Sequence, residues 1–508
     1  MATLKTKIGV FNGKKGDIVE QYLGIKYASL SDQLAVPEIF SSYGAEIDAT
    51  KFGSRCIAGD ACAFEQSVLL QEAIDTPEAP LMSGTECLNL NIYRPGTSFD
   101  KPLPVMVFIH GGGYIIGSSH WPQYEPSRLV KLSVELGTPV IAVNFKCALL
   151  WIKAHVEAFG GDPENVTVFG ESAGAVSVLS QLSSEESLFK RGISMSGTPV
   201  MLKPLELPRA EANYAVIMKA LGLEDISLEG RIQKLKTVSP EELIAKTPMS
   251  APTIPYLDGD VVPFKTTFRS LKRVSEKDAP IVPGRQWCEE LMIGDCQHDG
   301  TIFFYMGLQP RLAGIASAFC ASLSKNLANP SSAHSIFTAY NISPETSDEE
   351  ATKKVFEFAT DIAYVYPALA FACSWPGKVY YYNFNEPNHW EGSFKGHSTH
   401  GLDAALVFQN YNEKLEPEAK KVAIEFAKDF IDFANGTTPW KQFDKQEGFT
   451  KAFGPSDQGV SKIVGQNGYG QGRRDALGKL SSEGKVDLDE LSLAWDAFIR
   501  EGFVFGNK

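Results

Sequence analysis

The chain has 508 residues, of which 44% are hydrophobic and 21% are charged, a composition typical of globular enzymes and not of disordered or fibrous proteins. Its net charge is −13, and no cluster of Lys and Arg accompanies an aromatic platform, so we expect no nucleic-acid partner. No segment has the length and hydropathy expected of a membrane span, and residues 1–7 lack the apolar core of a signal peptide. The sequence as written therefore predicts a cytoplasmic protein.

Short apolar runs alternate with helical stretches along the chain. The runs that we expect to form strands are 105–109, 139–143, 166–169, 192–195, 291–294 and 378–384. Helices are expected at 205–222, 417–434 and 486–502, and Ser239 with Glu242 has the pattern of a capping box that starts another helix. This alternation predicts an α/β fold with a mostly parallel central sheet and helices on both faces.

The first motif in chain order is His110-Gly111-Gly112-Gly113, which directly follows the apolar run 105–109. Three consecutive glycines leave backbone N–H groups uncovered by side chains. Such groups can bind the negative oxygen of a tetrahedral intermediate. Loss of one donor typically raises the activation barrier of the reaction by about 3 kcal/mol. The alternative is a flexible glycine turn without a chemical role.

The second motif is Gly170-Glu171-Ser172-Ala173-Gly174, which lies between a β-rich apolar run and the helix-compatible run 173–182. This order is typical of a nucleophile elbow, in which a sharp strand-to-helix turn exposes one serine. The N–H of Ala173 would then face the substrate oxygen, and the helix N-terminus would add positive potential. The alternative is a Gly-Ser corner with no chemistry, because such pentapeptides also occur by chance.

Further blocks accompany these two motifs. They are 23–28, 86–93, 110–114, 158–166 running into the elbow, 196–197 and 400–403. Together they resemble the type-B carboxylesterases, the cholinesterase-like family of α/β hydrolases, densely from about residue 20 to 200 and more sparsely afterwards. The resemblance implies one α/β-hydrolase domain over residues 1–508, with insertions over the active site.

The resemblance also implies a nucleophile, an acid and a histidine in that chain order. The nucleophile is Ser172, and the histidine is His400, which heads a His-Gly-x-acid pattern. The acid position falls on Asp299, where the family usually has Glu. The shorter Asp side chain can still orient an imidazole and stabilise its cation, provided that the local backbone lies closer. Asp295 is the rival acid, and a plain Asp-Gly turn is the structural alternative for Asp299.

By the same resemblance, the N–H groups of Gly112, Gly113 and Ala173 form the oxyanion hole, and neither a metal ion nor an organic cofactor takes part. The implied partner is a small-molecule ester, and the sequence implies no oligomeric state. Cys56 and Cys87 occupy positions that resemble the first disulfide of the family. Because many members are secreted, secretion stays an alternative if the N-terminus is incomplete.

One departure from the family lies near residues 146–150. In the family, the strand ending in Asn-Tyr-Arg is followed by a long loop that opens a helix, whereas here Asn144 to Cys147 run directly into 148–152. Roughly two dozen residues are absent, although strand-to-helix connections of a few residues are ordinary in α/β units. The missing loop supports the wall beside the nucleophile, so its loss is expected to loosen the site. A genuine variant and a mispredicted gene product both fit this pattern.

The sequence thus predicts a carboxylic-ester hydrolase that works through a covalent acyl-enzyme. A lipase, a thioesterase and an acyltransferase would use the same site with another leaving group or acceptor. A catalytically inactive scaffold that binds partner proteins is the alternative of a different class. Inactive members tend to lose the nucleophile, whereas Ser172, Asp299 and His400 are all present in this chain.

Overall fold

The structure, a computed structural model, describes residues 1–144, 148–248, 251–273, 282–465 and 475–501. The predicted shortened connection falls partly on residues 145–147, which lie outside this set. Strand β9 (Ile141–Asn144) ends directly before them, and helix α3 (Leu149–His155) begins shortly after them.

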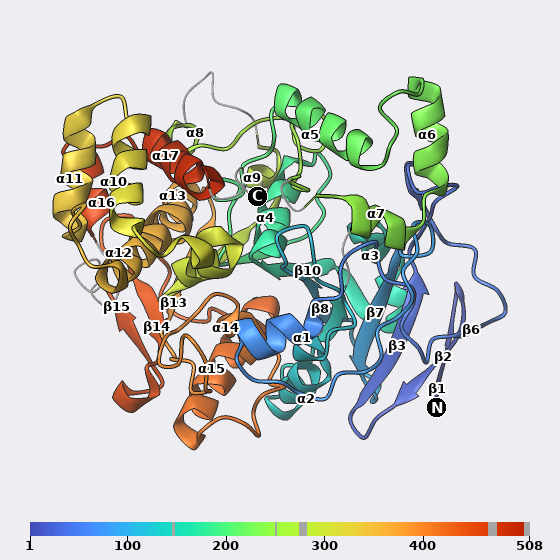
Figure 1. The fold of residues 1–508 in the computed structure, drawn as a ribbon. Helices are drawn as coiled ribbons and strands as arrows, with labels where there is room; N and C mark the ends of the chain where they lie inside the picture. The colour runs from blue at the N-terminus through green and yellow to red at the C-terminus, as the bar shows by residue number, and fades with distance from the viewer. Residues whose placement is uncertain (145–147, 249–250, 274–281, 466–474, 502–508) are drawn as a thin grey trace.

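Thirteen strands of the described residues form one sheet (Figure 1). In spatial order they are β1 (Ala2–Thr6), β2 (Gly9–Lys15), β3 (Val19–Lys26), β7 (Asn89–Pro95), β9, β8 (Leu103–Ile109), β10 (Gly161–Glu171), β11 (Arg191–Met195), β12 (Glu290–Cys296), β13 (Lys378–Phe384), β14 (Thr450–Phe453) and β15 (Ser461–Val464), with β6 (Glu46–Asp48) beside β2. A separate pair is formed by β4 (Ala28–Ser29) and β5 (Glu38–Ile39). Neighbouring strands from β9 to β14 are parallel, and the other neighbours in this order are antiparallel. The short strand β6 is parallel to β2. The predicted mostly parallel sheet is therefore confirmed.

The central strands contain continuous apolar runs because both faces of the sheet are covered. In β8, Val105, Val107 and Ile109 pack into one core cluster, and Met106 and Phe108 pack into the cluster on the opposite face. A strand buried on both sides needs apolar residues at every position, and that is why these runs are continuous and not alternating.

Helices cover both faces of the sheet (Figure 1). They are α1 (Cys62–Phe64), α2 (Ser127–Glu135), α3, α4 (Ala173–Ser180), α5 (Leu207–Ala220), α6 (Leu228–Thr237), α7 (Pro240–Lys246), α8 (Phe268–Lys272), α9 (Gly284–Trp287), α10 (Ile315–Asn326), α11 (Pro330–Tyr340), α12 (Asp348–Thr360), α13 (Tyr366–Ser374), α14 (Leu402–Val407), α15 (Pro417–Ala434), α16 (Ala476–Ser482) and α17 (Leu488–Glu501). Residues of α2, α14 and α15 belong to one core cluster, and residues of α3, α4 and α10 to α13 belong to the other.

The predicted helices 205–222, 417–434 and 486–502 correspond to α5, α15 and α17. Helix α7 starts as predicted, because the Ser239 side chain accepts the N–H of Glu242 at 3.1 Å. The carboxylate of Glu242, however, pairs with Lys246 at 2.7 Å and so does not complete the capping box.

One stretch corrects the expectation that no segment reaches spanning length. Helices α12 and α13 run on through residues 361–365, so that Asp348–Ser374 is long and apolar enough to cross a membrane. Within its most apolar window, 72% of the stretch is buried inside the protein. Packing in the core accounts for its apolar character.

Candidate active site

Ser172 lies on the sharp turn between β10 and α4, as the elbow motif predicts. Its φ of 54° and ψ of −120° form a strained conformation that non-glycine residues rarely adopt. A side chain at Gly170 would collide with the backbone of Gly174, and one at Gly174 would collide with the carbonyl of Ile109. The glycines of the motif are therefore needed for the turn, and Ser172 itself stays partly exposed.

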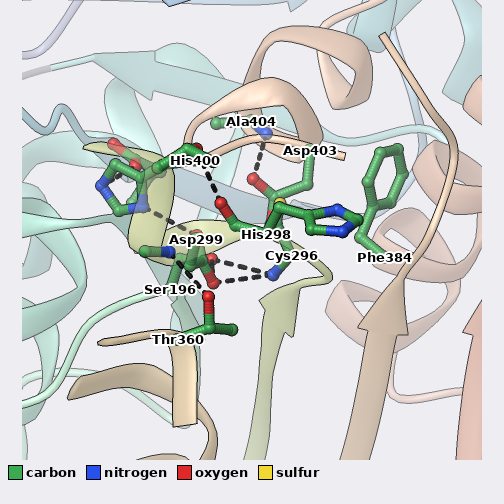
Figure 2. Close-up of polar contacts among 12 residues, drawn as sticks. Ser196, Cys296, His298, Asp299, Thr360, Phe384, His400, Asp403 and Ala404 are labelled. Atoms are coloured by element: carbon green, nitrogen blue, oxygen red, sulfur yellow. Dashed lines mark hydrogen bonds and ion pairs between the residues drawn. The ribbon is translucent and has the colours of Figure 1, made fainter. Parts of the chain in front are cut away.

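Asp299 and His400 meet in the core, although 101 positions separate them in the chain. Asp299 lies directly after β12, His400 lies in the loop before α14, and Oδ1 of Asp299 is 2.8 Å from Nδ1 of His400 (Figure 2). The other oxygen, Oδ2, accepts the Ser196 hydroxyl at 2.9 Å and the Cys296 N–H at 2.8 Å. These bonds fix the carboxylate, which in turn fixes the orientation of the imidazole ring.

The rival acid, Asp295, has different partners. Its Oδ2 accepts the Tyr381 hydroxyl at 2.6 Å and the Asn383 amide at 3.2 Å, both from β13. The geometry thus favours Asp299 over Asp295 as the partner of His400. It also shows that Asp299 does more than close an Asp-Gly turn.

The second imidazole nitrogen contacts a residue that the sequence analysis missed. Nε2 of His400 lies 3.1 Å from Oε1 of Glu171, within ion-pair distance but without hydrogen-bond geometry. The Ser172 hydroxyl makes no hydrogen bond with any described residue. Gly111 leaves room for the Glu171 side chain, because a Cβ atom at position 111 would collide with Oε2 of Glu171. A charged residue at the buried end of β10, directly after the run 166–170, was the available signal.

Buried acidic groups surround His400. Burial raises the pKa of Glu171 and of Glu65, and burial followed by the charge of Asp299 raises the pKa of Asp403 to about 6. Burial alone would lower the pKa of His400, but Glu171 and Asp299 outweigh this effect and raise it above its ordinary value. The site therefore stabilises a protonated imidazole, the form that a general base takes after it has accepted a proton.

Two of the three residues predicted to form the oxyanion hole, Gly112 and Gly113, lie in the glycine loop after β8. Gly112 and Gly113 have φ values of 104° and 61°, and the Gly112 carbonyl accepts the N–H groups of Ile115 and Ile116 at 2.9 and 3.0 Å. Within the described part of the chain, the N–H groups of Gly112, Gly113 and Ala173 donate to no protein acceptor. They are thus available to an external oxygen.

Two further predictions concern cysteine and metal chemistry. Cys56 and Cys87 line the same cavity, next to the glycine loop, and their disulfide stays a prediction. Among the residues that the structure describes, no group of three or more His, Cys, Asp or Glu side chains is arranged to hold a metal ion.

The chain matches the sequence model of the carboxylesterase family over residues 1–147 and 145–471. The two stretches meet where the sequence analysis placed the missing segment. Lipase 3 of Yarrowia lipolytica is 27% identical over 468 residues, which are 85% of this chain and 87% of that protein. Para-nitrobenzyl esterase of Bacillus subtilis is 31% identical over 270 residues, which are 47% of this chain and 51% of that protein. A PNB esterase structure shares the fold, with a TM-score of 0.70, 24% identity and coverage of 92% of this chain and 98% of that one.

Proposed function

Because the chain belongs to the carboxylesterase family and is a carboxylic-ester hydrolase, we propose that it cleaves small-molecule esters through a Ser172–His400–Asp299 triad. The observation that carries this proposal is the 2.8 Å contact between His400 and Asp299. Asp299 follows β12 and the strained Ser172 follows β10, so both lie at the carboxyl ends of parallel strands. An imidazole held by a carboxylate supports the proposal, because acyl transfer by a serine requires such a pair to accept the hydroxyl proton.

In the proposed first step, Oγ of Ser172 attacks the carbonyl carbon of the ester, and Nε2 of His400 takes the hydroxyl proton. Asp299 holds Nδ1–H and stabilises the imidazolium. The N–H groups of Gly112, Gly113 and Ala173 form the oxyanion hole, which binds the negative oxygen of the tetrahedral intermediate.

In the second step, His400 returns the proton to the leaving alcohol, and an ester between Ser172 and the acyl group is left. Water then attacks this acyl-enzyme, with His400 again as the base, and the acid is released. Before the first attack, Nε2 must exchange its contact with Glu171 for one with the Ser172 hydroxyl, so Glu171 sets the charge state from which the reaction starts.

This role of Glu171 predicts a change in pH dependence. The base must be neutral to accept a proton, so kcat/KM rises with pH through the pKa of His400. The Glu171 carboxylate raises that pKa, and Glu171→Gln is therefore expected to move the acid limb of the profile to lower pH. Glu86→Gln, at an exposed residue paired with Lys26, is the matched control and should leave the limb in place. An unmoved limb in Glu171→Gln, or a shift to higher pH, would contradict the role.

The proposed function is tested with p-nitrophenyl esters. We expect a burst of p-nitrophenol that is stoichiometric with the protein at high ester concentration, because a covalent acyl-enzyme accumulates. Folded protein that shows neither burst nor turnover would refute the hydrolytic mechanism and favour the inactive scaffold. The Yarrowia relative is named a lipase, and this supports long-chain esters as a second substrate class. Preference for decanoate over acetate esters would assign the chain to that class.

A further inference from the structure

We propose that a cavity beside helix α4, separate from the catalytic serine, binds a monocarboxylate with an apolar tail, such as a medium-chain fatty acid anion, through Arg285. The cavity lies between α4, α8, α9 and α13. Its principal lining residues are Val176, Leu179, Leu271, Phe371, Trp375 and Arg285.

The cavity has the character of a small-molecule site, because one charged group meets largely apolar walls. Most of its walls are aliphatic or aromatic, so they suit a hydrocarbon tail. Ser172 does not line it, but Val176 does, and the Val176 N–H donates to the Ser172 carbonyl at 3.0 Å. An occupant would thus touch the helix that carries the nucleophile, one turn away from it.

Arg285 supplies the charge. Its Nη2 donates to the carbonyl of Ser374, and its guanidinium lies 5.6 Å from the ring centre of Trp375. Within the described residues no carboxylate pairs with Arg285, whereas the buried Arg191 pairs with Glu290 at 3.5 Å. Burial lowers the pKa of Arg285, with no acidic group acting in the opposite direction.

An arginine keeps its charge in proteins, and a half-buried cation without a counter-ion is costly. A bound carboxylate would offset that cost, because the planar guanidinium has further N–H donors that match the two oxygens of a carboxylate. A neutral ligand would leave the charge uncompensated. The pairing of one cation with apolar walls therefore selects a molecule with one anionic end and one hydrocarbon end.

Of the hydroxyl groups that line the cavity, those of Ser180 and Ser270 donate to backbone carbonyls. Ser183 and Thr266 line it, and within the described residues neither hydroxyl has a hydrogen-bond partner. Ser183 lies close to Arg285 in space, because their chain neighbours Leu182 and Gly284 are in close contact. A Cβ atom at Gly284 would lie 2.6 Å from the Leu182 Cα. Both hydroxyls can donate to a carboxylate.

The test is calorimetric titration of the full chain with decanoate, with 1-decanol and with acetate. The protein first reacts with a fluorophosphonate, or carries Ser172→Ala, so that turnover plays no part. We expect decanoate to bind, Arg285→Met to weaken it at least tenfold and Arg285→Lys to retain part of the affinity. Arg269→Met, an exposed arginine paired with Asp487, is the matched control and should bind as the parent does. Binding of 1-decanol should not change with Arg285→Met.

A second variant tests the location independently of the charge. Val262 lines the cavity from a loop, and Val262→Trp should fill it and weaken both decanoate and 1-decanol, with an unchanged circular dichroism spectrum. Equal decanoate affinity in Arg285→Met and the parent, or in Val262→Trp and the parent, would overturn the proposal. Acetate binding as tight as that of decanoate would overturn it as well. These results do not depend on whether the chain hydrolyses esters. The carboxylate-binding cavity can therefore be refuted without refuting the proposed hydrolytic mechanism, and the reverse also holds.

Discussion

Ser172→Ala is expected to lower kcat for p-nitrophenyl acetate by about 10⁶-fold, the loss found when a serine nucleophile is removed from a comparable triad. The substitution removes the only atom that the proposed mechanism joins to the acyl group. The alanine keeps the partly exposed elbow position and removes no hydrogen bond found among the described residues, so the melting temperature should stay close to that of the parent. Initial rates over a range of protein concentrations measure the effect.

The control for this prediction is Ser187→Ala, at an exposed serine in the loop after α4. It should leave kcat unchanged. If Ser172→Ala keeps a rate within tenfold of the parent while Ser187→Ala behaves normally, the covalent step does not use Ser172, and the proposed mechanism fails.

Asp299→Asn is expected to lower kcat by about 10⁴-fold, as neutralisation of the triad acid does elsewhere. Oδ1 of Asp299 accepts Nδ1–H of His400, and an amide at this position favours the wrong tautomer of the imidazole and no longer stabilises its cation. Because Oδ2 also accepts the Ser196 hydroxyl and the Cys296 N–H, some loss of stability should accompany the loss of rate. Rates at saturating ester, with the folded fraction taken from thermal melts, separate the two effects.

Asp295→Asn is the informative comparison, because Asp295 is buried in the same region and contacts Tyr381 and Asn383 instead of His400. It should reduce stability while leaving the kcat of the folded protein near that of the parent. A larger loss of kcat in Asp295→Asn than in Asp299→Asn would transfer the acid role to Asp295.

The centre of the fold follows directly from the sequence, and its edges do not. Strands β8 to β13 are buried on both faces, so each one reads as an apolar run that a window of a few residues detects. Strand β1 alternates buried and exposed positions, and β2 contains Asn, Gly and Lys among its seven residues. Strand β2 also pairs with β6, from which β3, β4 and β5 separate it in the chain, and local composition does not reveal such a tertiary contact.

In the candidate site too, some features follow from the local sequence and others arise only from contacts between distant residues. The elbow at Ser172 is a local feature, since the collisions that require Gly170 and Gly174 occur within one turn and its supporting strand. The pairing of Asp299 with His400 was expected from the family resemblance, and their contact agrees with it. The contact of Glu171 with His400 was not expected, because the motif leaves that position open. The cavity around Arg285 was not expected either, because it forms only when α9 packs against the end of α4.

The most direct measurement of the central claim is labelling of the folded chain with a fluorophosphonate probe, followed by peptide mass spectrometry. The account predicts one adduct, on the peptide that contains Ser172, absent in Ser172→Ala and formed far more slowly in Asp299→Asn. A folded chain that takes up no probe, or that carries the adduct on another residue, would contradict it.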